Sequence, residues 1–432
     1  MNNKVAKVAV AGAVAMVLAS TMSGSLLPGY VTTAAADDAK PADTAKPQVS
    51  AAAGKDLQEA QKDMQAQKWD DMLVVLDKVK NNPKKNEYDE HVMNEFYVTA
   101  YANKKQLQQA TGPLEYLITS KYTPADELNK RVVQASFLYY QLQNYDKAVD
   151  FGNRAIKGGY ATDQVQLVVA QSYYLKNDFK DTATFVHGLV DDQIKAGMTP
   201  TDEILQLGLS AEVKLNDEAG EIHWLELLVT YHPKAEYWQN LLDGLLRTKM
   251  PDRELLQVLR LSAEVGAMKN GSDYTEMAQA ALDAGSPGEA VTVLSKAFAE
   301  NAFTDPAEKN RNQHLLDTAK KQAAADQPTL AKAETDAMAA AGGDKLVGVG
   351  TGYFGYGEYD KAAKDIAAGL AKGATKDTEN ARLLLGIAQF KAGSKDEAIK
   401  TFNAVKGDAP LQRIAALWAL HVKAPASSAA AT

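Results

Sequence analysis

Six histidines and one glycine-rich string are the residues whose types could support metal, acid–base or nucleotide chemistry. No two histidines have the H-x-x-x-H or H-E-x-x-H spacing that places metal ligands on one helical face. They are His91, His187, His223, His232, His314 and His421. The string from Gly350 to Gly355 matches G-x-G-x-x-G, but a dinucleotide site requires a preceding strand, and no strand pattern precedes it. With no G-x-S-x-G motif and no phosphate-binding loop, we expect no catalytic residue, no cofactor and no metal site.

Composition and charge exclude several classes of protein. The 432 residues are 46% hydrophobic and 24% charged, which is typical of a folded chain with an extensive core. The net charge of −8 lacks the basic excess of a nucleic-acid-binding protein, so we expect no nucleic-acid partner. The absence of cysteine excludes disulfides, thiolate metal sites and cysteine nucleophiles. No motif indicates a small-molecule substrate.

Two tyrosine pairs, at 139–140 and 173–174, lie 34 residues apart, and the residues that follow them recur at the same distance. The matched positions are Asn144 and Asp178, Tyr145 and Phe179, and Ala148 and Thr182. A period of this length with aromatic and small residues at fixed offsets is typical of the tetratricopeptide repeat, a helix–turn–helix unit. One such unit cannot bury its own apolar face. We therefore predict an all-α fold, a right-handed α-solenoid of stacked helix pairs.

Small residues mark the places where the two helices of a repeat must approach closely. Three predicted repeats have such residues on both helices: Ser136 with Ala148, Gly350 with Ala362, and Gly386 with Ala398. We predict about ten helix pairs, one of them from the weakly patterned region 304–342. A helix at 408–423 should then cap the last repeat, because its apolar residues lie on one face.

Tyr140 and Tyr174 each follow an interior tyrosine by one residue, at a position that faces the concave groove in tetratricopeptide repeats. A tyrosine there offers apolar area with a polar tip, which suits recognition of a protein partner. The same register predicts six further groove residues, Lys130, Gln171, Glu212, Asp243, Arg247 and Phe390. The alternative is that these side chains form an ordinary solvated helix face.

The first residues have the pattern of a secretory signal, because Lys4 and Lys7 precede an apolar run and three alanines precede Asp37. We predict the domain order signal peptide 1–36, flexible linker 37–54, α-solenoid 55–423 and disordered tail 424–432. With no cysteine in the chain, the periplasm is the expected location. An uncleaved N-terminal anchor is the alternative, and it is the one arrangement that would bring membrane contact.

Two parts of the chain resemble a narrower family. Residues 228–238 join a helix end to an aromatic helix start, and the motifs at 384–388, 396–398 and 415–419 follow near the end. Together they are similar to the secreted tetratricopeptide proteins associated with TonB–ExbB–ExbD energy-transduction systems of Gram-negative bacteria, over residues 121–423. The resemblance implies a periplasmic accessory scaffold for outer-membrane transport. Its implied partners are TonB, ExbB, ExbD or a TonB-dependent receptor.

Two other functions remain open from the sequence. One is an envelope-assembly scaffold that holds peptidoglycan or polysaccharide machinery, which would use the same concave face. The other is an enzyme, which would need a site hidden in the weakly patterned region 304–357. The expected function is therefore non-catalytic binding of protein partners.

Overall fold

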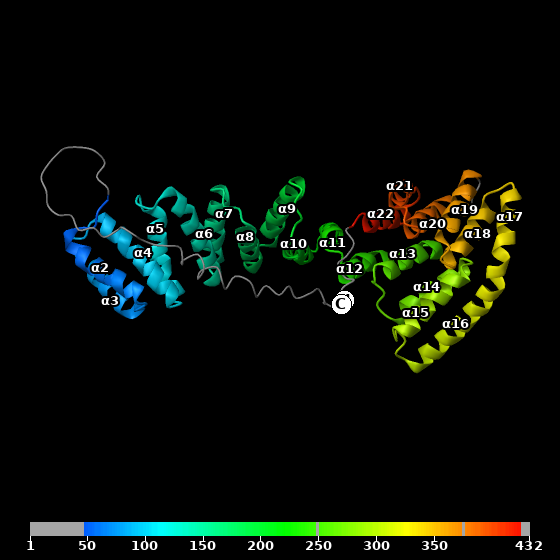
Figure 1. The fold of residues 1–432 in the computed structure, drawn as a ribbon, viewed down its shortest axis with the longest axis horizontal. Coiled ribbons are helices and arrows are strands. Elements are labelled where there is room, and N and C mark those ends of the chain that lie inside the picture. The colour runs from blue at the N-terminus through cyan, green and yellow to red at the C-terminus, as the bar shows by residue number, and fades with distance from the viewer. Residues whose placement is uncertain (1–46, 248–249, 374–375, 425–432) are drawn as a thin grey trace. The chain divides into compact units, whose positions relative to one another are not determined.

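The computed structural model describes residues 47–247, 250–373 and 376–424, and all regular structure in these ranges is helical (Figure 1). The chain divides after Asp217 into two compact parts, which we call the N-terminal unit and the C-terminal unit. The predicted all-α fold of successive helices is confirmed. The repeat spacing does not predict the division into two units.

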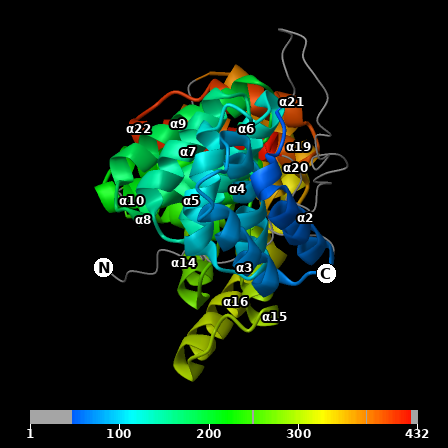
Figure 2. The same ribbon diagram turned by 90° about the vertical axis from the view of Figure 1, so that its left-hand side faces the viewer.

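In the N-terminal unit, the helices pack mainly on their near neighbours along the chain, and Figure 2 views this unit with α2 and α3 toward the viewer. Their bounds are α2 (Ala51–Gln65), α3 (Trp69–Lys80), α4 (Glu87–Asn103), α5 (Leu107–Thr119), α6 (Ala125–Gln141), α7 (Tyr145–Lys157), α8 (Asp163–Leu175), α9 (Phe179–Lys195) and α10 (Asp202–Leu215).

The start of the N-terminal unit differs from the predicted linker. The predicted signal peptide 1–36 lies outside the described residues, as does the tail from 425. The predicted linker 37–54 is described only from residue 47, and α2 begins inside it, at Ala51. Ser50 caps this helix and anchors it to α4, because its hydroxyl donates to Asp89 Oδ2 at 2.6 Å. Alanine-rich composition indicated a linker, but Ala53 is fully buried against the core.

Several helix hairpins reverse at a single residue in the left-handed backbone region. The corresponding residues in seven hairpins are Gln67, Lys105, Gln143, Asn177, Gly285, Gly357 and Gly393, with φ between 54° and 86°. A left-handed residue after the last helical turn lets its amide bond to a helix carbonyl and ends the helix. The same turn therefore recurs with quite different residue types.

Close crossing of the paired helices is confirmed. Ser136 donates to the carbonyl of Ala148 at 2.9 Å, and both residues are fully buried. A Cβ placed on Gly350 would lie 2.6 Å from Ile366 Cγ1, and one on Gly386 would lie 2.5 Å from Phe402 Cε1. At these distances a larger residue would force its neighbours to shift, which explains why the sequence has small residues at these positions.

The C-terminal unit contains the remaining helices. Their bounds are α11 (Glu218–Tyr231), α12 (Ala235–Leu246), α13 (Asp252–Glu264), α14 (Gly271–Asp283), α15 (Pro287–Ala299), α16 (Pro306–Asp326), η2 (Gln327–Thr329), α17 (Leu330–Ala339), α18 (Asp344–Gly355), α19 (Tyr359–Ala371), α20 (Thr378–Lys391), α21 (Lys395–Asn403) and α22 (Ala409–Lys423).

The prediction of a helix pair within 304–342 is wrong. The segment α16–η2–α17 runs on as one long curved arch, in which α16 packs on α15 and α17 packs on α18 (Figure 1). Residues 306–339 contain no glycine that could supply a reversing turn. Pro328 lies in the first turn of η2, where a missing amide hydrogen is tolerated, so the helix bends instead of ending. Helices α15 and α18, which the segment α16–η2–α17 separates in the sequence, pack directly on each other.

The last helix closes the C-terminal unit on itself. As predicted, α22 packs on the preceding repeat, but it also packs on α11 and α13 at the start of the unit. Arg413 of α22 forms an ion pair with Glu226 of α11, which is 187 residues away in sequence. Trp418 Nε1 donates to the carbonyl of Gln257 in α13 at 3.3 Å. The helices of this unit therefore enclose an interior rather than forming an open row.

Candidate functional site

The structure brings together two of the predicted groove residues, Tyr140 of α6 and Gln171 of α8. The hydroxyl of Tyr140 donates to Gln171 Oε1 at 2.8 Å, and both side chains are half-buried. Burial raises the pKa of the Tyr140 hydroxyl, and the nearby Tyr145 adds to this shift. The hydrogen bond links the first helices of two consecutive repeats.

Tyr140 and Tyr174 each contact the first residue of the next helix in their own hairpin. The rings of Tyr140 and Tyr145 lie edge to face at 6.0 Å, and those of Tyr174 and Phe179 at 5.2 Å. Tyr140 and Tyr174 are half-buried. Tyr139, next to Tyr140, is buried as predicted and donates to Glu115 at 2.6 Å, whereas Tyr173, next to Tyr174, is itself half-buried and not interior. Each of the two rings is therefore held in a fixed orientation by its own hairpin.

The other predicted groove residues of the N-terminal unit have partners of their own. Lys130 is exposed and pairs with Glu127 one turn earlier on α6, at 2.7 Å. Glu212 is buried in α10, and its Oε1 lies 3.2 Å from Nε2 of His187. Glu212 therefore lies in the packing between α9 and α10 rather than on an open surface.

The three predicted groove residues of the C-terminal unit are dispersed. Asp243 pairs with Lys269, and Arg247 is exposed at the end of α12. Phe390 lies against α22, with its ring centroid 5.4 Å from that of His421 and 6.3 Å from that of Trp418. The eight predicted residues therefore lie in both units, and Phe390 contacts the returning helix.

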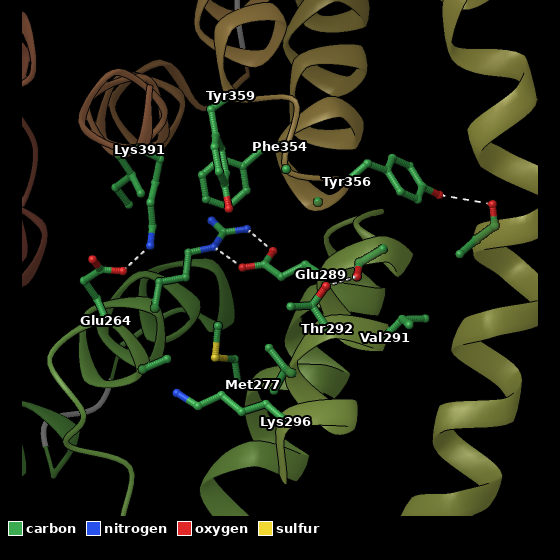
Figure 3. Close-up of a pocket in the computed structure, with 18 of the residues that line it drawn as sticks. Glu264, Met277, Glu289, Val291, Thr292, Lys296, Phe354, Tyr356, Tyr359 and Lys391 are labelled. Carbon is green, nitrogen blue, oxygen red and sulfur yellow. Dashed lines mark hydrogen bonds and ion pairs between the residues drawn. The ribbon is translucent and has the colours of Figure 1, made fainter. Parts of the chain in front are cut away.

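A half-open cavity of about 600 Å³ lies in the C-terminal unit (Figure 3). Its lining comes from α13, α14, α15, α18, α19, α20 and α22, with single residues from α16 and η2. Aromatic and aliphatic side chains form much of its wall. They include Met277, Val291, Val293, Phe354, Tyr356, Tyr359, Ile387 and Trp418. The charged residues of the lining are Arg260, Glu264, Glu289, Lys296 and Lys391. Sequence reasoning missed this site, because its walls come from helices far apart in the chain and no local motif marks them.

Arg260 is the most tightly held of these charged groups. Its guanidinium makes two hydrogen bonds to the Glu289 carboxylate, at 2.7 and 2.6 Å, and a third to Gln257 Oε1 at 3.1 Å. The Phe354 ring lies 4.9 Å from the guanidinium carbon, within range of a cation–π contact. The side chains of Arg260 and Glu289 are only 4% and 8% exposed. Arg260 also borders a second cavity, of about 730 Å³.

Glu264 of α13 contacts two helices from the end of the C-terminal unit, α20 and α22. Its carboxylate pairs with Lys391 of α20 and lies 3.9 Å from Nε2 of His421 of α22. Burial acts to raise the pKa of Glu264, but the hydrogen bonds from His421 and Lys391 outweigh it and lower the pKa to about 2. The carboxylate is therefore charged at neutral pH.

The described part of the chain contains neither a cluster of metal-ligating side chains nor a membrane-spanning helix. Within residues 47–424, apart from the two short gaps, no three His, Asp or Glu side chains come together as metal ligands. Over the same ranges, no helix combines the length and the apolar character that spanning a membrane requires. The string Gly350–Gly355 lies within helix α18.

Comparison with known proteins finds no matching family model and no matching curated protein. Among solved structures, the chain is similar to yeast Tom70, with 10% identity over 86% of this chain and 95% of that chain at a TM-score of 0.20. It is also similar to the P58(IPK) TPR domain, with 14% identity over 80% and 99% of the two chains at a TM-score of 0.20. A third similar structure is the Cut9–Hcn1 hetero-tetramer of the APC/C, with 12% identity over 84% and 83% at a TM-score of 0.19. At such low TM-scores these likenesses support no conclusion about function.

Proposed function

We propose that the protein is a non-catalytic scaffold that binds protein partners through the tyrosine-bearing face of its N-terminal unit. The observation that carries this proposal is a half-buried tyrosine, Tyr140 or Tyr174, at one position of two consecutive repeats. Each ring is braced by an aromatic residue of its own hairpin, so it offers contact area with little entropy to lose on binding. Tyrosine is also among the residues enriched in protein interfaces.

In the cell, we place this scaffold in the periplasm, as an accessory component of a TonB-type energy-transduction system for outer-membrane transport. Support for this finer assignment comes from the sequence: the signal pattern before Asp37, the absence of cysteine and the resemblance over 121–423. Its partners would be TonB, ExbB, ExbD or a TonB-dependent receptor. An envelope-assembly scaffold would have peptidoglycan or polysaccharide machinery as its partner instead.

Site-directed crosslinking in cells tests both levels of the proposal. A photo-crosslinking aromatic amino acid replaces Tyr174, and the same amino acid at the exposed Val74 of α3 serves as the control position. We expect capture from position 174 only, with TonB, ExbB, ExbD or a receptor among the products. Capture of glycan-synthesis machinery would favour the envelope-assembly role. Equal products from both positions would contradict a binding role for the tyrosine face.

Matched substitutions separate binding from packing. Tyr174→Ala removes the ring, and we expect it to weaken capture while lowering the free energy of unfolding by about 1–2 kcal/mol through the lost contact with Phe179. Tyr174→Phe keeps the ring, so it should retain most of the capture. Circular dichroism checks that both variants keep their helicity. If the two variants capture equally well, the ring serves only the packing of its hairpin.

A further inference from the structure

The 600 Å³ cavity of the C-terminal unit has a volume within the range of small-ligand pockets, about 300–1,000 Å³. Its wall combines apolar and charged groups. Three aromatic residues from different helices line it: Phe354 of α18, Tyr359 of α19 and Trp418 of α22. Ile387 and Val291 add aliphatic surface to the lining. The returning helix α22 contributes Trp418 to the lining. The cavity belongs to neither the tyrosine face nor any function proposed above.

The charges around the cavity do not cancel. The lining contains three cations, Arg260, Lys296 and Lys391, and two carboxylates, Glu264 and Glu289. Glu289 is paired with Arg260, and Glu264 is paired with Lys391. The lining therefore has a positive excess of one charge, although the whole chain has a net charge of −8.

Lys296 is the cation that supplies this excess. Its Nζ lies 3.9 Å from Oε1 of Glu300, the residue that caps the end of α15, and its side chain is 48% exposed. An ion pair this long between exposed side chains is worth less than about 1 kcal/mol, so the ammonium can exchange it for another anion. Lys296 lies on the same side of the cavity as Thr292 and Met277 (Figure 3).

We propose that the cavity binds a carboxylate joined to an apolar group, with the carboxylate at Lys296 and the apolar part against Phe354, Tyr359 and Trp418. An acidic side chain flanked by apolar residues in a peptide has this chemistry, and so does a free amphipathic acid. The paired carboxylates of Glu264 and Glu289 keep their own cations, so the ligand displaces neither ion pair. Apolar aromatic walls give a small site its affinity, and a single charged group such as Lys296 fixes the orientation of the ligand.

Titration calorimetry with two pairs of probes tests the proposal on the full chain. One pair is an octapeptide with blocked ends that carries a single Glu among Leu and Val residues, and its Gln counterpart. The other pair is decanoate and decanol. We expect the acidic member of at least one pair to bind, and to bind better than its neutral counterpart. The pair that binds identifies the source of the carboxylate, and binding should also change the fluorescence of Trp418, which lines the cavity.

Variants locate the binding. Lys296→Glu should weaken binding of the acidic probe by about three- to tenfold and should leave the neutral probe unaffected. Lys309→Glu makes the same change at an exposed position of α16 outside the lining and should have no effect. Thr292→Trp fills the cavity from an exposed position and should abolish binding while circular dichroism stays unchanged.

Three results would overturn the proposal: no saturable binding of either acidic probe, equal binding of acidic and neutral probes, or equal effects of Lys296→Glu and Lys309→Glu. Tyr174→Ala lies in the other unit and should leave probe binding unchanged. Failure of the cavity proposal is therefore distinguishable from failure of the scaffold proposal.

Discussion

Replacing Arg260 by methionine should destabilise the C-terminal unit more than any exposed ion-pair substitution. The change leaves the Glu289 carboxylate, 8% exposed, without the two hydrogen bonds of 2.7 and 2.6 Å that Arg260 donates. Each hydrogen bond to a charged group contributes about 1.5–3 kcal/mol, and breaking a buried ion pair costs about 3–5 kcal/mol. Methionine keeps apolar contact with the Phe354 ring. We therefore expect a loss of about 3–5 kcal/mol in the free energy of unfolding.

The double variant Arg260→Met/Glu289→Leu tests the cause. With both charges gone, no buried carboxylate is left unpaired, so the double variant should recover most of the loss. The control is Arg382→Met, which removes a partly exposed ion pair with Glu379 and should cost less than about 1 kcal/mol.

Urea unfolding followed by tryptophan fluorescence is the appropriate assay. Three of the four tryptophans, Trp224, Trp238 and Trp418, are buried in the C-terminal unit, so the signal reports mainly on that unit. A loss no larger than that of Arg382→Met would refute the reasoning. A double variant less stable than Arg260→Met would refute it too, because the two residues would then not be coupled.

Two further predictions concern helix packing and pH. Gly350→Ala should lower the free energy of unfolding by about 1–3 kcal/mol, because its Cβ would lie 2.6 Å from Ile366 Cγ1. Gly348→Ala in the same helix meets nothing within 4 Å and should be neutral or stabilising, and equal melting shifts for the two variants would contradict the close crossing. The pKa of Glu264 is lowered from 4.5 to about 2, so its stabilisation is present above pH 4.5 and is lost as the pH falls toward 2. Glu264→Gln should therefore lose less stability than the unsubstituted protein across this acid range, and parallel pH curves for the two would contradict the assigned ion pair with Lys391.

Local features of the fold were predictable because each repeat carries its own packing signals. Ser136 and Ala148 are small because their backbones nearly touch, and the sequence shows this directly. The aromatic residues Tyr145 and Phe179 also recur at the repeat spacing, but their contact with Tyr140 and Tyr174 was not predicted. Recurrence alone does not distinguish a residue that binds a partner from one that braces its neighbour.

Closure of the C-terminal unit was not predictable in the same way. It depends on pairs such as Arg413 with Glu226 and Lys391 with Glu264, more than 100 residues apart, whose members resemble ordinary exposed charges in the sequence. The predicted cap at 408–423 was found, but the contact of Phe390 with His421 and Trp418 of this helix was not predicted. The arch α16–η2–α17 was missed because its alanine-rich and lysine-rich sequence predicts a helix but not the direction in which the helix runs.

The return of α22 to α11 and α13 also limits how the gene can change in length. Arrays of repeats commonly gain or lose whole units by duplication or deletion, which an open row accommodates at little cost. An additional helix pair within the C-terminal unit would carry Arg413 away from Glu226 and would expose the surfaces that α22 covers. In the N-terminal unit, an additional pair would simply stack on its neighbours. Inherited variation in repeat number should therefore accumulate before Asp217, while the number of helices after it stays constant.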